Sequence, residues 1–92
     1  MTLPDGVRHA RTLLEPLMRG GADARRERLA TIRAVLDQPG FAEAAAALGV
    51  HRNTLAYRIR RIEEITGWSL ADPDLRLPLA IAVRLVGVDR AE

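Results

Sequence analysis

The chain has 92 residues, which is enough for one hydrophobic core and excludes a second independent domain. It has no cysteine, which excludes disulfides and thiolate metal sites, and no apolar run approaches the ~20 residues of a membrane-spanning helix. Nearly half of the residues are apolar but only three are aromatic, which favours packed helices with an aliphatic core. With no export signal or membrane segment in view, we expect a cytoplasmic protein.

The N-terminal third predicts two helices. The first, from Gly6 to Met18, should be short or kinked, because Pro16 interrupts its hydrogen-bond ladder. Two glycines then separate it from a second helix, which should begin with Asp23 as its N-cap and run to about Asp37. The expected buried stripe of this helix consists of Leu29, Ile32 and Leu36.

Two shorter helices should follow in the middle of the chain. Residues 41–48 are rich in alanine, with Phe41, Ala45 and Leu48 on one side, and a glycine ends the segment. Residues 52–66 carry apolar side chains at spacings of four, three and three, which indicates a helix with one buried face. These side chains are Leu55, Ile59, Ile62 and Ile65. Gly67 suits a left-handed residue after this helix, and Trp68 should pack back on Ile62.

The last segment is ambiguous, because apolar residues between Leu75 and Leu85 alternate as they would in a strand. A helix over about 74–86 is favoured, since Asp72 or Asp74 can cap it, Pro73 or Pro78 suits its first turn, and no partner strand is evident. A winged-helix variant, with residues 68–86 as a hairpin, remains the alternative.

We therefore expect an all-α fold, a small bundle of about five helices that contains a helix-turn-helix. Residues 1–22 would form an N-terminal helical or linker segment, and residues 23–88 would form the helix-turn-helix domain. The turn has the required residue types, because Ala45 permits a close helix crossing, Gly49 permits positive φ, and Val50 fills the space between the helices.

Basic charge is concentrated in the second helix of this motif. The net charge is only +2, yet the stretch from His51 to Ile62 holds four arginines and no acidic residue. The rest of the chain has ten arginines against twelve acidic residues. Such a local basic face suits a polyanion, and the second helix of a helix-turn-helix enters the major groove of DNA.

The helix expected over residues 52–66 presents two sets of side chains to solvent. Opposite the apolar side, we expect base contacts from Asn53, Ala56, Tyr57 and Arg60. Phosphate contacts are expected from residues at the exposed N-terminus and the edges of that face. These are His51, Arg52, Thr54, Arg58 and Arg61. His51 stays open between a helix cap and a phosphate contact.

Two other functional classes fit the sequence less well. An enzyme is not expected, because the only histidines are His9 and His51 and neither has a carboxylate at ligand spacing, so no catalytic residue, metal site or cofactor is predicted. A helical protein-protein interaction module, with the arginines as a solvated face, is the alternative to double-stranded DNA binding.

The run from Ala44 to Gly67, which includes VHRNTLAYR at residues 50–58, resembles the C-terminal helix-turn-helix of PucR/CdaR-type bacterial transcriptional regulators. The resemblance extends from Leu14 to Leu85. It implies the output domain of a transcriptional regulator that normally carries an N-terminal sensory region, so a missing sensory domain and a homodimer on DNA are expected. Ala56, where a larger residue is common, and Pro39-Gly40 depart from the family pattern.

Overall fold

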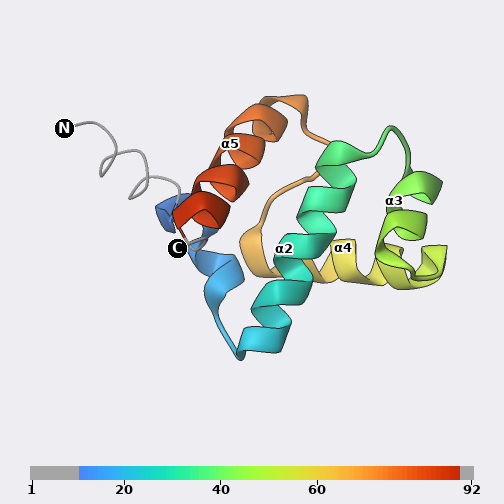
Figure 1. The fold of residues 1–92 in the computed structure, drawn as a ribbon, viewed down its shortest axis with the longest axis horizontal. Helices are drawn as coiled ribbons and strands as arrows, with labels where there is room; N and C mark the ends of the chain where they lie inside the picture. The colour runs from blue at the N-terminus through green and yellow to red at the C-terminus, as the bar shows by residue number, and fades with distance from the viewer. Residues whose placement is uncertain (1–10, 90–92) are drawn as a thin grey trace.

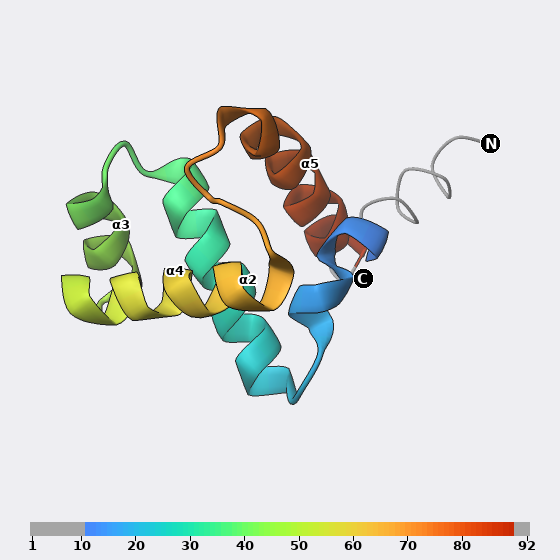
Figure 2. The ribbon, with the colours of Figure 1, turned by 180° about the vertical axis from the view of Figure 1, so that it is seen from behind.

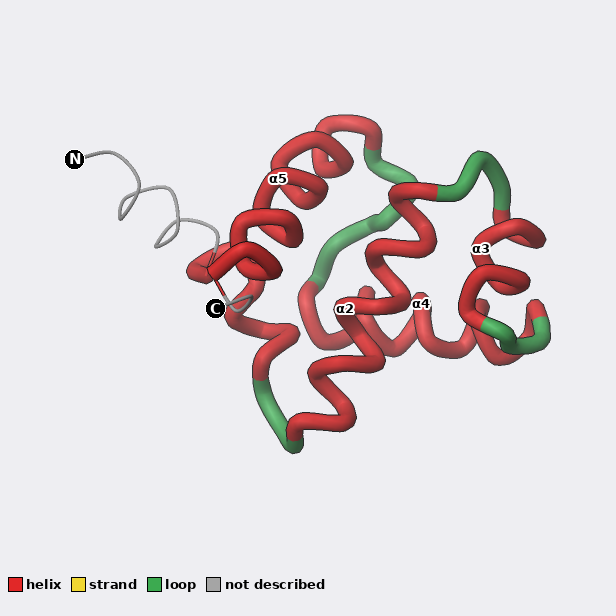
Figure 3. Tube along the Cα trace, viewed as in Figure 1, coloured by secondary structure: helices red, strands yellow, loops and turns green. Residues whose placement is uncertain are grey.

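The computed structural model describes residues 11–89, with side chains as far as Leu85, and the described part is helical without strands. A helical turn at residues 11–14 leads into η1 (Glu15–Met18), followed by four α-helices (Figures 1 and 3). These helices are α2 (Ala22–Asp37), α3 (Phe41–Leu48), α4 (Arg52–Thr66) and α5 (Pro73–Asp89). The all-α prediction is confirmed, and α5 excludes the hairpin alternative. Residues 6–10, where the first helix was expected to begin, lie outside the described residues.

The first helical segment passes from α-helical to 3₁₀ geometry at Glu15, directly before Pro16. The expected role of Asp23 as N-cap of the next helix is wrong. Gly21 occupies that position without a side-chain cap, and Asp23 lies in the first turn of α2. There its carboxylate pairs with Arg26 and its charge is favourable at the positive end of the helix dipole.

Helix α2 is the centre of the fold, because it contacts η1 and each of α3, α4 and α5. Figures 1 and 2 show α3 and α5 on opposite sides of α2, with α4 crossing α2 on the face seen in front in Figure 2. The larger core cluster joins η1, α2, α4 and α5. It includes Leu14, Leu17, Ile32, Ile62 and Leu79, all fully or almost fully buried. The core therefore includes Leu14 and Leu17, which precede residue 23, the expected start of the helix-turn-helix domain.

A second, smaller cluster holds the helix-turn-helix against α2. It consists of Ala34, Ala44, Ala45 and Leu55, so three alanines surround one fully buried leucine. Small side chains let the three helices approach closely, as expected for Ala45. Ile59 packs against both clusters and is only partly buried, so it links the motif to the rest of the core.

Two arginines stabilise the end of η1 by binding backbone carbonyls. Arg25 Nη1 donates to Met18 O (3.3 Å) and Gly20 O (3.0 Å). Arg28 Nη1 donates to Leu17 O (3.2 Å) and Arg19 O (2.6 Å). These two side chains satisfy the carbonyl groups that η1 and the following turn leave without helical partners. Arg25 and Arg28 therefore have a structural role and do not belong to the basic face formed by the arginines of α4.

Helix α5 begins as its sequence predicts. The Asp72 carboxylate accepts a hydrogen bond from Asp74 N (2.9 Å), and Pro73 occupies the first helical position. Arg76 Nη2 donates to Leu36 O (3.4 Å) at the end of α2, which fixes α5 against the core. Within residues 11–89, no helix combines the length and the apolar character needed to cross a bilayer.

Candidate nucleic-acid interface

The turn between α3 and α4 is a tight, well-bonded C-cap. Gly49 has a φ of 70°, in the left-handed region, and its N–H donates to Ala46 O (3.0 Å). Val50 N donates to Ala45 O (3.1 Å), which completes a Schellman motif, and the Val50 side chain packs against the smaller core cluster. The turn therefore sets the angle at which α4 leaves α3, without help from side-chain hydrogen bonds.

His51 is the N-cap of α4, because its Nδ1 accepts a hydrogen bond from Asn53 N (3.0 Å). A nitrogen that accepts carries no proton, so in the neutral ring the proton is on Nε2. The His51 side chain is exposed, so Nε2 remains able to donate to a phosphate oxygen. A helix cap and a phosphate contact are therefore compatible in the one His51 side chain.

The outward face of α4 is open to solvent. Asn53, Tyr57 and Arg60 are all exposed, Tyr57 by 56%. Arg52 and Thr54 are exposed beside them, whereas Ala56 is half-buried. Leu55 and Ile62 are buried on the opposite side, and Ile59 and Ile65 lie at its half-buried edges. The three outward side chains are polar and long enough to reach the edges of bases in a groove.

Arg58 lies in a different environment from Arg60. Its guanidinium pairs with Glu27 of α2, with 3.4 Å between Nη2 and Oε2, and its side chain is only 24% exposed. A hollow of about 200 Å³ opens here, with Tyr57, Thr31 and Arg61 among its lining residues. Helix α2 therefore brings an acidic side chain, Glu27, to the edge of the basic face of α4, although α4 itself has no acidic residue before its last turn.

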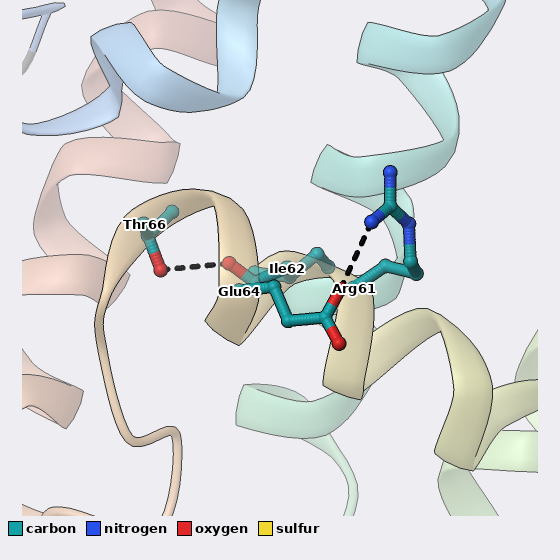
Figure 4. Close-up of polar contacts among 4 residues, drawn as sticks. All are labelled: Arg61, Ile62, Glu64 and Thr66. Atoms are coloured by element: carbon teal, nitrogen blue, oxygen red, sulfur yellow. Dashed lines mark hydrogen bonds and ion pairs between the residues drawn. The ribbon is translucent and has the colours of Figure 1, made fainter.

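Arg61 and the last turn of α4 belong to the candidate interface (Figure 4). Arg61 Nη1 donates to Glu64 Oε1 (2.9 Å) in an exposed pair one turn apart. Thr66 Oγ1 donates to Ile62 O (2.8 Å) and accepts from Trp68 N (3.1 Å), so this hydroxyl links the last turn to the following loop. Trp68 is partly buried against the cluster that contains Ile62. Gly67, with a φ of 79°, is the expected left-handed residue.

Glu63 has a structural role that the sequence did not reveal. Its Oε2 accepts a hydrogen bond from Leu70 N (2.8 Å), which anchors the loop between α4 and α5.

Phe41, expected on the side of Ala45, is 45% exposed and lines a shallow groove with Val35 and Ile59. Among the described residues, no group of three His, Cys, Asp or Glu side chains is placed to hold a metal ion.

Comparison with known proteins agrees with this geometry. A family model described as the PucR C-terminal helix-turn-helix domain matches residues 28–85. A protein of Thermomonospora curvata described as an uncharacterized protein in the pkwA 5′ region is 44% identical over 75 residues, which cover 80% of this chain and 41% of that protein.

Two named regulators are also similar. The purine catabolism regulatory protein of Bacillus subtilis is 46% identical over 45 residues, which cover 49% of this chain and 8% of that protein. The carbohydrate diacid regulator of Escherichia coli is 54% identical over 39 residues, which cover 42% of this chain and 10% of that protein. The chain thus spans less than half the length of these relatives, and no solved structure matches it. Since the family model covers more than half of the chain, the chain belongs to the family of PucR C-terminal helix-turn-helix domains of transcriptional regulators.

Proposed function

We propose that this chain binds double-stranded DNA sequence-specifically, as the output domain of a transcriptional regulator, with α4 in the major groove. The observation that carries the proposal is the exposed polar face of α4, where Asn53, Tyr57 and Arg60 stand opposite the buried Leu55. An α-helix fits the width of the major groove, and a helix-turn-helix presents its second helix there.

In this proposal, Asn53, Ala56, Tyr57 and Arg60 contact bases. Asparagine can bond adenine through two atoms and arginine can bond guanine in the same way, whereas Tyr57 and Ala56 supply apolar contact. Among the described residues, neither the Asn53 amide nor the Arg60 guanidinium has a protein partner, so neither must give up a bond in order to reach a base.

Phosphates are bound by side chains around the base-reading set. His51 Nε2, Arg52 and Thr54 lie at the N-terminal end of α4, where the helix dipole also favours an anion. Arg58 and Arg61 lie further along and are held by Glu27 and Glu64. Each must leave or share a carboxylate in order to bind DNA, so we expect a smaller contribution from these two than from Arg52.

We further propose that the chain acts as a homodimer on DNA and works in the cytoplasm. One recognition helix reads only a few base pairs, and two half-sites about one helical turn apart are the usual remedy. The names of the relatives describe regulators of purine catabolism and of carbohydrate diacids, and neither name is carried over to this chain.

Selection from a library of random duplexes tests the proposal. The expected result is an enriched sequence with a two-fold repeat, bound with an affinity that falls steeply with salt concentration. If no sequence is enriched, and if salt does not weaken the residual binding to duplex DNA, a protein-interaction module is favoured and the proposal is overturned. Replacing Arg60 with alanine should lower enrichment, whereas the matched change Arg33→Ala, on an exposed arginine of α2, should not.

A further inference from the structure

Helix α5 carries an exposed stripe on the side opposite its core contacts. The stripe consists of Asp74, Leu77, Ile81 and Arg84, at spacings of three, four and three, so all four lie on one face of the helix. Leu77 is 68% exposed and Ile81 is 50% exposed, whereas Leu79, Ala82 and Val83 of the same helix are buried in the core. Two large apolar side chains in the middle of an exposed face indicate a surface for a partner.

The order of residues along this stripe is self-complementary. An acid stands at one end, a base at the other, and two apolar residues lie between, symmetric about position 79. When a second copy of the helix is laid antiparallel with its two-fold axis at that level, Asp74 faces Arg84 of the other copy and Leu77 faces Ile81 of the other copy. A contact between two copies related by a two-fold axis requires a self-complementary surface. Binding to a partner of unrelated sequence would not require one.

We infer that α5 pairs antiparallel with α5 of a second copy of this chain. Helix α5 lies on the opposite side of α2 from α3, so the pairing leaves the helix-turn-helix uncovered (Figures 1 and 2). Arg84 is free to join, because its side chain is 78% exposed and its contact with Asp37 is long, at 4.0 Å. This inference supplies the interface for the proposed homodimer, and it is tested without DNA so that the two proposals fail separately.

The contact is small. Four side chains per copy bury less than the ~800 Å² per partner that is typical of stable complexes, so the dimer is weak and reversible in solution. Holding both copies on one duplex would raise their effective concentration and strengthen the pairing. The chain has no cysteine of its own, so single introduced cysteines can form a disulfide only with each other. Such a disulfide can trap the register of the two α5 helices even when the dimer is weak.

Charge reversal in two separate chains tests the pairing. Asp74→Arg places a base opposite Arg84 of the other copy, and Arg84→Glu places an acid opposite Asp74, so each variant alone should self-associate about tenfold more weakly by sedimentation equilibrium. An equimolar mixture of the two variants restores both opposite-charge pairs and should associate at least as well as the unmodified chain. Arg33→Glu, which changes the charge equally at an exposed position of α2, should have no effect.

Disulfide trapping tests the register. Residues 74 and 84 are ten positions apart, or about 15 Å along a helix, so in antiparallel pairs two copies of residue 74 are too distant for a disulfide. A mixture of Asp74→Cys and Arg84→Cys chains, one carrying a size tag, should therefore form the mixed disulfide and little of either homodimer. Formation of the three species in the proportions of random pairing, or failure of the charge-reversed mixture to recover association, would overturn the inference. Melting curves confirm that each variant is folded.

Discussion

Releasing Arg58 from Glu27 should strengthen DNA binding. The substitution Glu27→Gln keeps the shape of the side chain and removes the carboxylate that lies 3.4 Å from the guanidinium. Because the Arg58 side chain is 24% exposed and that of Glu27 is 50% exposed, the pair is partly screened by solvent. A pair of this kind contributes about 0.2 to 1 kcal/mol, so its removal should cost folding stability no more than that.

The same free energy becomes available to a phosphate contact. A gain of up to about 1 kcal/mol corresponds to an increase in affinity of up to about fivefold, and a fully engaged Arg58 should steepen the salt dependence by up to about one unit. Fluorescence anisotropy on a selected duplex and a scrambled duplex, at several salt concentrations, measures both quantities. Both duplexes should be affected alike, because a phosphate contact carries no base information.

Two controls isolate the cause. Asp23→Asn removes the same charge from the same helix, but its partner is Arg26 rather than a residue of α4, so it should change affinity less. In an Arg58→Ala background, Glu27→Gln should lose its effect, since the two substitutions act through one pair. An equal gain from Asp23→Asn, or a gain that persists without Arg58, would refute the view that Glu27 restrains Arg58.

Three further predictions concern folding and are measured by thermal and denaturant unfolding. Leu55→Ala should cost about 2 to 5 kcal/mol, because Leu55 is fully buried among alanines that cannot fill the cavity, and a loss below about 1 kcal/mol would contradict this packing. Ala45→Leu should cost about 1 to 3 kcal/mol, since the added atoms would push α3 from its neighbours, and an unchanged melting temperature would show that this crossing has spare room. Gly49→Ala should cost about 1 kcal/mol from left-handed backbone strain alone, because nothing lies within 4 Å of the added methyl group; Gly49→Asn should cost less, and equal losses would point to another cause.

The helix-turn-helix is predictable from the sequence because its determinants are local. Helices α3 and α4 begin and end at the residues expected, since Gly49 and Gly67 permit the left-handed turns and His51 supplies a cap within two residues of its partner. The start of α5 depends in the same way on Asp72 and its neighbours. Such signals need no knowledge of how the helices cross.

Contacts between helices were not predictable in this way. Glu27 and Arg58 are 31 positions apart, and they meet only because α2 crosses α4 at that level. Arg25 and Arg28 bind carbonyls of η1 and its turn, and no local pattern in the sequence indicates these contacts. Periodicity indicates which side of a helix is buried, but it does not say which helix covers that side.

The central claim, that the outward face of α4 reads bases in the major groove, is tested most directly by Asn53→Ala and Arg60→Ala. Anisotropy with a selected duplex and a scrambled duplex measures each variant. The account predicts a loss of about 1 to 3 kcal/mol on the selected duplex and little loss on the scrambled one, with folding unchanged because both side chains are exposed. Equal losses on the two duplexes would mean that these side chains bind phosphates, and would contradict the proposed orientation of α4 in the groove.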